Sequence, residues 1–542
     1  MQPLRFSGTF LARTAALTSR IGISPHFSGW MVKWQRSCRR TGLSKRSRRR
    51  SRRWQKISRR GGDGLPKELF EAHWDLLGES FMALVKSFEA TTTLPTETKE
   101  AVTILLHKKG EKDELNNYRP ITLLNFTYKV LARVVADRMK SVLHMVIFPE
   151  QYGFIPGWRL SDAVALVADV IDAVKNGNED LILLLVDFQK AFDSVSRDFV
   201  FEVQYQMGFP ERFVGWIKGL HNNTSTKLLV NGWQGKGVDG ASGVRQGCPL
   251  APYIFLCAVE PLAREVERQE LGLSKQGLRF NYLGYADDTT LALQGEEQIV
   301  KAEKVLDKFE KASGLATNKA KSVLLLLGAN LGAKGDGSSC FKWARADEVE
   351  MLLGVWVTPS GSGLPTWEKA WEHIMGKLTK WQLKYLTTRA RATDINNYIS
   401  PLLAFQAQIY PPPAEIWEEV IRLIQSFTSG NRVATVKGFI LWSKSLLYTP
   451  REAGGIGVKD PEIMITYLAA RRVGLYLTER NPMKKAIMAQ AADLPVGVDT
   501  FSSHALLLKH WKGRSMRWKQ MATASSNPRS ASGQRRIAEK RF

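Results

Sequence analysis

The sequence predicts an α+β fold, in which apolar strand-like runs alternate with amphipathic helices. The clearest strand is LILLLVDF, residues 181–188, an apolar run with a carboxylate near its end. Asn231-Gly232, between KLLV and WQ, predicts a tight hairpin because both turn positions favour positive φ. The clearest helix has an apolar stripe at spacings of three and four residues, formed by Val164, Val167, Ile171 and Val174.

The remaining N-terminal elements follow in chain order. GGDGLP, residues 61–66, predicts a loop that opens the folded region, and residues 69–88 have helical periodicity. AVTILLHKK, 101–109, predicts a strand followed by basic residues, and NNYRPITLL a turn and a short strand. Ser161 can cap the helix that Asn176-Gly177 ends. An earlier helix has four apolar residues on roughly one face, namely Val130, Val134, Met139 and Val142.

Beyond residue 328, LGAKGDGSSC predicts a loop. A stripe at helical spacing then predicts one amphipathic helix, formed by Trp367, Trp371, Ile374, Leu378, Trp381 and Tyr385. Core packing explains this stripe better than an aromatic contact with nucleic acid. YPPP, 410–413, separates it from a helical segment over about 415–427, and the Ser- and Arg-rich tail after Ser525 is typical of disorder.

Charge is concentrated at the N-terminus. Residues 1–60 hold 17 Lys and Arg and no Asp or Glu, so most of the formal net charge of +25 lies there. SKRSRRRSRRWQKISRR, 44–60, could contact phosphates, act as a nuclear address, or be a solvated disordered tail. The first twenty residues, acid-free with Arg and Ser, also fit an organellar transit peptide. The expected location is the nucleus or the cytoplasm.

Cysteine usage and hydropathy exclude several classes of protein. The four cysteines form no C-x-x-C pair, which argues against a disulfide framework or a zinc site and favours a reducing compartment. No run approaches eighteen apolar residues, so a membrane span is not expected. The length of 542 residues allows two to four domains.

Paired carboxylates stand out in FNYLGYADDTTLALQ, 280–294. Asp287 and Asp288 interrupt two apolar runs that predict a hairpin. Because adjacent buried carboxylates repel each other, the pair requires water, protons or cations. Asp187, at the end of a predicted strand, offers a third carboxylate. Nucleotidyl transfer uses two cations about 4 Å apart, and Mg²⁺ prefers oxygen ligands such as these.

These segments resemble the reverse transcriptases of non-LTR (LINE-type) retrotransposons. The likeness covers about residues 61–360 and runs in family order. Its motifs are LLHKKGEKDELNNYRPITLLN, EQYGFIPGWRLSDAV, LLVDFQKAFDSVSRDFV, SGVRQGCPLAPYIF, LGYADDTTL, SGLATNKAKS and LLGVWV. A further likeness, to the region after the polymerase in such elements, lies in YTPREAGGIGVKD, 448–460.

The resemblance implies an α+β right-hand polymerase with an antiparallel palm sheet and a mostly helical C-terminal region. It implies a basic arm over 1–60, fingers and palm over 61–328, primer grip and thumb over 329–400, and a helical region with a disordered tail over 401–542. The implied activity is RNA-directed DNA polymerisation with two Mg²⁺ ions. The implied partners are an RNA template, a DNA primer or target DNA, and dNTPs, with no membrane.

The resemblance also assigns roles to single residues. It makes Asp187, Asp287 and Asp288 the metal ligands, with the Phe188 carbonyl as a further ligand. It places Phe192 against the sugar of the incoming nucleotide, and Gln246 and Gly247 in the nucleotide pocket. It makes Arg119, with Lys108 or Lys109, the contact to the triphosphate. Lys321 would protonate the pyrophosphate, and Leu353-Gly354 would grip the primer. On spacing alone, Phe192 could be a core aromatic, Arg119 an ion-pair partner and Lys321 a solvated charge.

Two alternatives stay open at this point. One is a catalytically inactive RNA-binding remnant, which the intact motif residues oppose. The other is a group II intron-type reverse transcriptase and maturase, although no maturase region or HNH motif is recognisable. LINE-type proteins usually carry an endonuclease before the polymerase and often a Cys/His knuckle after it. Only the basic arm precedes Gly61 and no Cys follows Cys340, so the expectation is a polymerase segment.

Overall fold

The computed structural model describes residues 61–491 apart from 109, 178, 241, 276–277, 329–338, 346–347, 360–362, 383–384, 411 and 432–440. The predicted basic arm, the transit-peptide-like stretch, the tail after Ser525 and most of the LGAKGDGSSC loop therefore lie outside the described residues.

The chain folds as two compact units. The described part of unit 1 comprises 61–158, Asp187–Glu270 and Lys301–Asn318, and that of unit 2 comprises Arg159–Val186, Leu271–Val300 and 319–491. Each unit is built from several stretches of chain, so neither corresponds to one of the four consecutive segments expected from the sequence. Those segment boundaries stay predictions.

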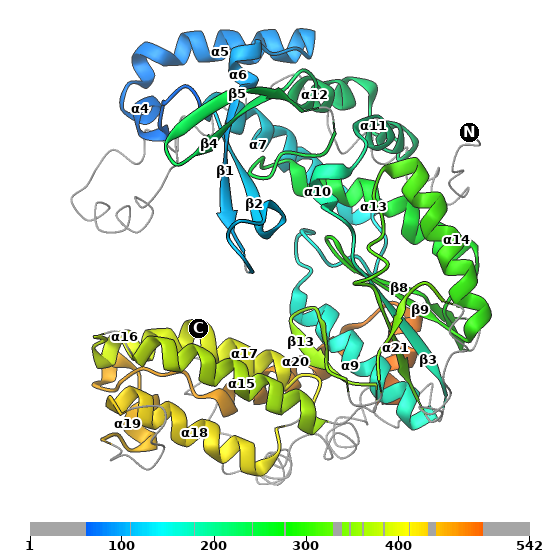
Figure 1. Cartoon of the computed structure of the whole chain (residues 1–542), viewed down its shortest axis with the longest axis vertical. Helices are drawn as coiled ribbons and strands as arrows, with labels where there is room; N and C mark the ends of the chain where they lie inside the picture. Colours follow the sequence, from blue (N-terminus) through cyan, green and yellow to red (C-terminus); the bar gives the residue numbers. More distant parts are fainter. Residues whose placement is uncertain are drawn as a thin grey trace. The chain divides into compact units, whose positions relative to one another are not determined.

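Unit 1 combines a small sheet with a group of helices (Figure 1). Its elements are α4 (Lys67–Ala72), α5 (Trp74–Thr91), α6 (Thr96–Lys99), β1 (Ala101–His107), η1 (Leu115–Asn117), β2 (Tyr118–Leu124), α7 (Phe126–Lys140), α8 (Leu143–Val146), α10 (Ala191–Ser194), α11 (Arg197–Gln206), α12 (Glu211–His221), β4 (Ser225–Val230), β5 (Trp233–Asp239) and α13 (Ala251–Arg268). Helix α14 (Glu296–Ser313) is divided between the two units.

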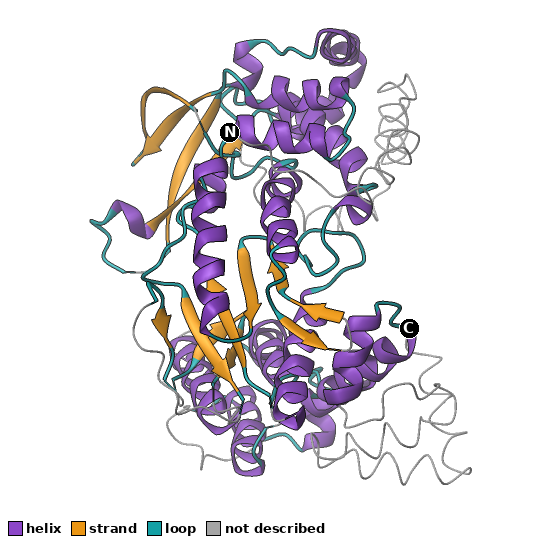
Figure 2. Cartoon of the chain, turned by 90° about the vertical axis from the view of Figure 1, so that its right-hand side faces the viewer, coloured by secondary structure: helices purple, strands orange, loops and turns teal. Residues whose placement is uncertain are grey.

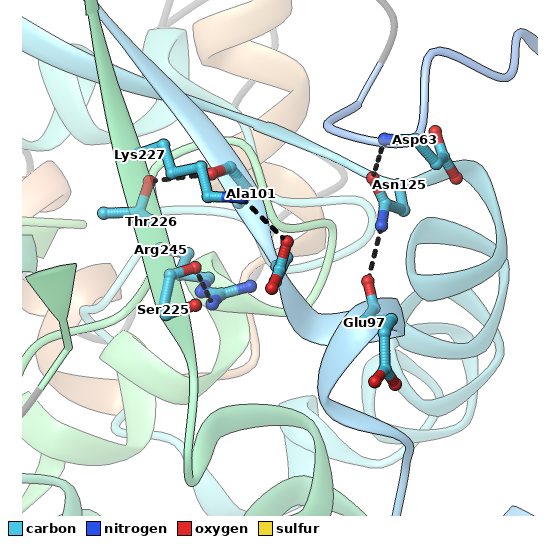
Figure 3. Close-up of polar contacts among 9 residues, drawn as sticks. Asp63, Glu97, Ala101, Asn125, Ser225, Thr226, Lys227 and Arg245 are labelled. Carbon is cyan, nitrogen blue, oxygen red and sulfur yellow. Dashed lines mark hydrogen bonds and ion pairs between the residues drawn. The ribbon is translucent and has the colours of Figure 1, made fainter. Parts of the chain in front are cut away.

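The sheet of unit 1 has the strand order β2-β1-β4-β5, in which only the pair β1–β4 is parallel. Side-chain hydrogen bonds hold the segments around the start of the small sheet together (Figure 3). The Asn125 side chain accepts from the Asp63 N–H at 3.2 Å and donates to the Glu97 carbonyl at 2.9 Å. The Thr226 hydroxyl donates to the Ala101 carbonyl at 3.3 Å. The first turn of the folded region is thereby held against the start of the sheet.

Unit 2 contains a five-stranded sheet and the C-terminal helices, and Figure 2 shows strands together with helices. Its elements are α9 (Leu160–Gly177), β3 (Leu181–Val186), β6 (Leu273–Lys275), β7 (Leu278–Phe280), β8 (Tyr282–Tyr285), β9 (Asp288–Leu293), β10 (Val323–Leu327), β11 (Lys342–Trp343), β12 (Glu350–Leu352), β13 (Val355–Val357), α15 (Gly363–Gln382), α16 (Thr388–Asp394), the π-helix η2 (Ile395–Ile399), α17 (Ser400–Gln406), α18 (Ala414–Ser429), α19 (Lys444–Tyr448), η3 (Arg451–Ala453), α20 (Pro461–Thr478) and α21 (Pro482–Ala491).

The large sheet has the order β11-β10-β3-β9-β8, and all its pairs are antiparallel except β10–β11. Its central strand β3 is buried along almost its whole length, as the apolar run predicts. Helix α9 contacts β8 and β10, and α21 packs on α9. Arg471 of α20 forms an ion pair with Asp162 of α9 at 2.5 Å. Both side chains are mostly buried, so this contact fixes a C-terminal helix to the helix that covers the sheet.

The hairpin predicted at Asn231-Gly232 is confirmed. Strands β4 and β5 pair antiparallel, with Val230 opposite Trp233. Asn231 has φ +50° and Gly232 has φ +88°, which are the two left-handed positions that a two-residue turn of this kind requires.

Four local predictions are wrong. The helix expected over 69–88 is two helices, α4 and α5, separated at His73, which has φ −120°. Helix α9 begins at Leu160, so Ser161 lies inside it, and its hydroxyl accepts from Arg471 instead of capping. Val142 lies beyond the end of α7, and Tyr385 lies beyond α15.

The core role expected for the stripe is confirmed for Trp367, Ile374 and Leu378, which are almost fully buried, whereas Trp371 and Trp381 are half-buried and Tyr385 is exposed. The Trp367 indole donates to the Tyr410 carbonyl at 3.1 Å. None of the helices described has the length and apolarity that crossing a bilayer requires.

Candidate active site

Four strands of the large sheet begin or end at one of its ends. Strand β3 ends at Val186, which pairs with Thr289 near the start of β9. Strand β10 starts at Val323, opposite Leu185 of β3, so it begins at the same end. Strand β8 ends at Tyr285, and the hairpin with β9 closes there. Residues that follow β3 or β8, or precede β9 or β10, therefore lie at the same end of the sheet.

The paired aspartates lie in the hairpin between β8 and β9. Tyr285 pairs with Asp288, so the loop consists of Ala286 and Asp287 alone. Both carboxylates are exposed, whereas Ala286 and Thr289 on either side are buried. Ala286 has φ +60°, a left-handed conformation that costs a non-glycine residue on the order of 1–3 kcal/mol. The strained turn aims two charges outward from a buried hairpin.

Asp187 is the residue that follows Val186, and its side chain is exposed. Asn318 holds it through two contacts: the Asn318 N–H donates to the Asp187 carbonyl at 2.7 Å, and the Asn318 amide donates to Oδ2 at 3.0 Å. These bonds orient the carboxylate from the SGLATNKAKS segment.

The Phe188 carbonyl is the other backbone group expected here. Phe188 forms an isolated antiparallel bridge with Thr317. The two bonds across this bridge use the Asp187 carbonyl and the Gln189 N–H, the latter donating to Ala316 at 2.9 Å. Neither of these bonds uses the Phe188 carbonyl. Its ring is buried near Phe309, with centroids 6.2 Å apart, so the side chain anchors the segment.

Phe192 lies on the short helix α10 in unit 1. Its ring stacks on the fully buried Phe255 of α13, with centroids 4.5 Å and ring planes 20° apart. Its side chain is only half-buried, so the ring that stacks on Phe255 is also partly accessible to solvent. The Phe192 carbonyl accepts from the Val244 N–H at 2.7 Å, which binds this turn to the SGVRQGCPL segment.

The SGVRQGCPL segment is held on several sides. The Arg197 guanidinium donates to the carbonyls of Gly240 at 2.6 Å, His221 at 2.7 Å and Gly243 at 2.9 Å. Arg245, also largely buried, donates to the Ser225 carbonyl at 3.2 Å (Figure 3). Burial lowers the pKa of both guanidinium groups. They work as carbonyl-binding anchors for the loop.

Gln246 and Gly247 contact residues of two elements, α10 and β2. The Gln246 amide donates to both carboxylate oxygens of Asp193 at 3.0 Å, and its carbonyl accepts from the Thr122 N–H of β2 at 2.8 Å. Gly247 has φ +117°, and a Cβ there would lie 2.5 Å from the Thr122 carbonyl oxygen. Only glycine fits this approach without displacing the β2 backbone.

Asp193 was missed by sequence reasoning. Burial raises the pKa of its carboxyl. The hydrogen bond from Gln246 and the positive charges of Lys108, Lys190 and Arg119 act in the opposite direction. Its position in AFDSVS, six residues after Asp187, was the only available signal.

The predicted basic residues are placed as follows. Arg119 is exposed on β2, opposite Leu106 of β1, and Lys108 follows β1. Lys109 lies outside the described residues. Lys321 is exposed in the turn before β10, at the end of the large sheet where β3 also ends.

The hairpin expected to grip the primer is formed by β12 and β13. Its two-residue turn consists of Leu353 at φ +52° and Gly354 at φ +81°. The Gln406 side chain of α17, which is buried, accepts from the Trp356 N–H at 2.9 Å and donates to its carbonyl at 3.0 Å. The second strand of the hairpin is thereby tied to the helices behind it.

The family model described as "Reverse transcriptase (RNA-dependent DNA polymerase)" matches residues 106–387, more than half of the chain. The chain belongs to the reverse transcriptase family. This membership confirms the resemblance and the α+β right-hand polymerase fold predicted from the motifs.

Curated relatives of this reverse transcriptase come from mobile elements. It is 28% identical over 376 residues to the Transposon TX1 uncharacterized 149 kDa protein of Xenopus laevis, covering 68% of this chain and 28% of that protein. It is 23% identical over 437 residues to the Retrovirus-related Pol polyprotein from type-1 retrotransposable element R2 of Popillia japonica, covering 74% and 58%. The chain thus spans roughly a quarter to just over half the length of these relatives.

Among solved structures, this reverse transcriptase is similar to apo telomerase from Candida tropicalis. The TM-score is 0.38 at 10% sequence identity, and the likeness covers 77% of this chain and 72% of that one.

Reverse transcriptases generally use divalent metal ions. Within the described part of this chain, no three His, Cys, Asp or Glu side chains lie together as a group that could hold a metal ion. The chemistry of the donors nevertheless fits a divalent metal ion, because all three carboxylates are exposed: Asp187 follows β3, Asp287 lies in the β8–β9 turn and Asp288 is the first residue of β9. The Asn318 amide that donates to Asp187 is the kind of group that orients a ligating carboxylate in metal sites.

Proposed function

We propose that this chain is an RNA-directed DNA polymerase that extends a primer 3′-hydroxyl on an RNA template, using dNTPs. One observation carries the proposal within the reverse transcriptase family: the register of β3, β9 and β8 presents Asp187, Asp287 and Asp288 from adjoining strand ends. Structural needs alone do not explain exposed carboxylates at the strained end of a buried sheet.

The three aspartates would hold two Mg²⁺ ions, with the Phe188 carbonyl as a further ligand. When bound, the ions activate the attacking 3′-hydroxyl and neutralise charge on the leaving pyrophosphate. The chain's own groups do the rest. Arg119, with Lys108 or Lys109 as helpers, binds the triphosphate, and Lys321 donates a proton to departing pyrophosphate.

Selection of the incoming nucleotide is assigned to the segments around α10. The ring of Phe192, supported by Phe255, would exclude a 2′-hydroxyl by steric contact. Gln246 and Gly247 shape the pocket next to it, and the hairpin turn at Leu353-Gly354 holds the primer end. The partners are an RNA template and a DNA primer or target DNA.

Primer extension on a primed RNA template with purified protein tests this function. Incorporation of dNTPs that requires Mg²⁺ supports it. Binding of RNA without any extension would indicate the inactive RNA-binding remnant instead. Activity that depends on an intron RNA would indicate a group II intron-type enzyme.

A further inference from the structure

The contact between Asp193 and Gln246 fixes the orientation of an amide in the proposed nucleotide pocket. One nitrogen, Nε2 of Gln246, donates to both Oδ1 and Oδ2 of Asp193 at 3.0 Å. An ionised carboxylate has no proton to donate, so the amide nitrogen must face Asp193 and Oε1 must face away. With an apolar or amide partner in place of Asp193, either end of the Gln246 amide could occupy this position.

The backbone of Gln246 is fixed independently of this side-chain contact. Its carbonyl accepts from the Thr122 N–H at 2.8 Å, and Gly247 approaches the Thr122 carbonyl too closely for a side chain. Asp193 is tied to the same segment, because the Ser242 hydroxyl donates to its carbonyl at 3.2 Å. The backbone therefore sets the position of Gln246, and Asp193 sets only the direction of its amide.

The surroundings of Asp193 connect it with the triphosphate contact. The groups whose charges act on it include Arg119 and Lys108 of the β1–β2 segment, and Lys190 at the start of α10. Phe192, the residue before it, forms the proposed wall against the sugar. A partly buried carboxylate that only stabilised the fold would not need to lie among the groups assigned to the nucleotide.

We propose that Asp193 is a positioning residue that fixes which end of the Gln246 amide faces the incoming dNTP, and so sets the affinity of the pocket for it. This inference rests on the proposed polymerase function. Asp193 itself does not touch the reacting atoms. It acts through Gln246, and a hydrogen bond to an ionised carboxylate is stronger than one between two neutral groups.

The test is steady-state kinetics of primer extension with Asp193→Asn, Asp193→Ala, Gln246→Ala and the double variant Asp193→Ala/Gln246→Ala. The matched control is Asp198→Asn, which changes an exposed carboxylate of α11. Asp193→Asn should raise KM for dNTP at least about tenfold, the ratio that corresponds to about 1.4 kcal/mol, and change kcat much less. The double variant should be no worse than Gln246→Ala alone, because the two residues act as one unit.

Melting temperatures separate this role from a structural one. If Asp193 only supported the fold, Asp193→Asn would lower Tm and leave KM for dNTP unchanged in the protein that stays folded. An unchanged KM, or a double variant whose defect is the product of the two single defects, overturns the inference while leaving the polymerase function intact. Absence of extension by the wild-type protein overturns both.

Discussion

Val186 of β3 pairs with Thr289 of β9 in an antiparallel ladder, so Asp187 and Asp288 are the next residues beyond this pair at the same end of the sheet. The strand register thus brings the strand positions next to these two carboxylates, which are 101 positions apart in sequence, to one end of the sheet. The apolar runs next to these aspartates form β3 and β9, which are buried along most of their length.

Sugar selection is tested by Phe192→Val. The smaller side chain should admit a 2′-hydroxyl and raise the ratio of kcat/KM for a matched rNTP over dNTP by roughly tenfold or more, the effect expected for a change in a pocket wall. Phe192→Tyr keeps the ring and is the control. If Phe192→Val extends primers with an unchanged ratio, the residue is a core aromatic and another group excludes the ribonucleotide.

The close approach of Gly247 to β2 is tested by Gly247→Ala. The added Cβ would meet the Thr122 carbonyl at 2.5 Å with φ at +117°, so the free energy of unfolding should fall by about 1–3 kcal/mol. Gly237→Ala on β5 meets nothing within 4 Å and should change it by less than about 0.5 kcal/mol. Urea unfolding of both variants measures the difference, and equal stabilities would contradict this account of the turn.

Gln406 links α17 to the hairpin assigned to the primer. Gln406→Ala leaves the buried N–H and carbonyl of Trp356 without that side chain, which costs about 1–3 kcal/mol for each unsatisfied group. Unfolding experiments should show this loss, with the exposed Gln234→Ala of β5 as control. A Gln406→Ala protein as stable as the control would show that water or a rearranged chain replaces these bonds.

The basic arm stays a prediction from sequence and has its own test. If residues 45–60 bind phosphates, deletion of residues 1–60 should weaken RNA binding and flatten its dependence on salt, because fewer counterions are released. Binding measured at several salt concentrations gives the slope. The solvated-tail interpretation predicts the same affinity and the same slope with and without the arm.

Local signals predicted the strands and turns well. Asn231-Gly232 specified its hairpin through the φ values of two residues, and the run 181–188 specified β3 through burial on both faces. The break at His73 was not predictable from periodicity, because the apolar pattern continues through it.

Long-range polar contacts were not predictable from the sequence either. Asp193 and Gln246 are separated by 53 positions, and Gln406 and Trp356 by 50. Their pairing depends on tertiary packing, which no local pattern encodes. The family motifs identified Gln246 but not the residue that orients it.

Primer extension by Asp287→Asn tests whether the paired aspartates hold the metal ions. The exposed Asp239→Asn of β5 controls for loss of a carboxylate elsewhere. With Mg²⁺, dNTPs and a primed RNA template, wild type and Asp239→Asn should extend the primer, while Asp287→Asn should keep its Tm and lose at least about 10²-fold in rate. Near-normal extension by a folded Asp287→Asn protein would contradict the assignment of these carboxylates to the metal ions.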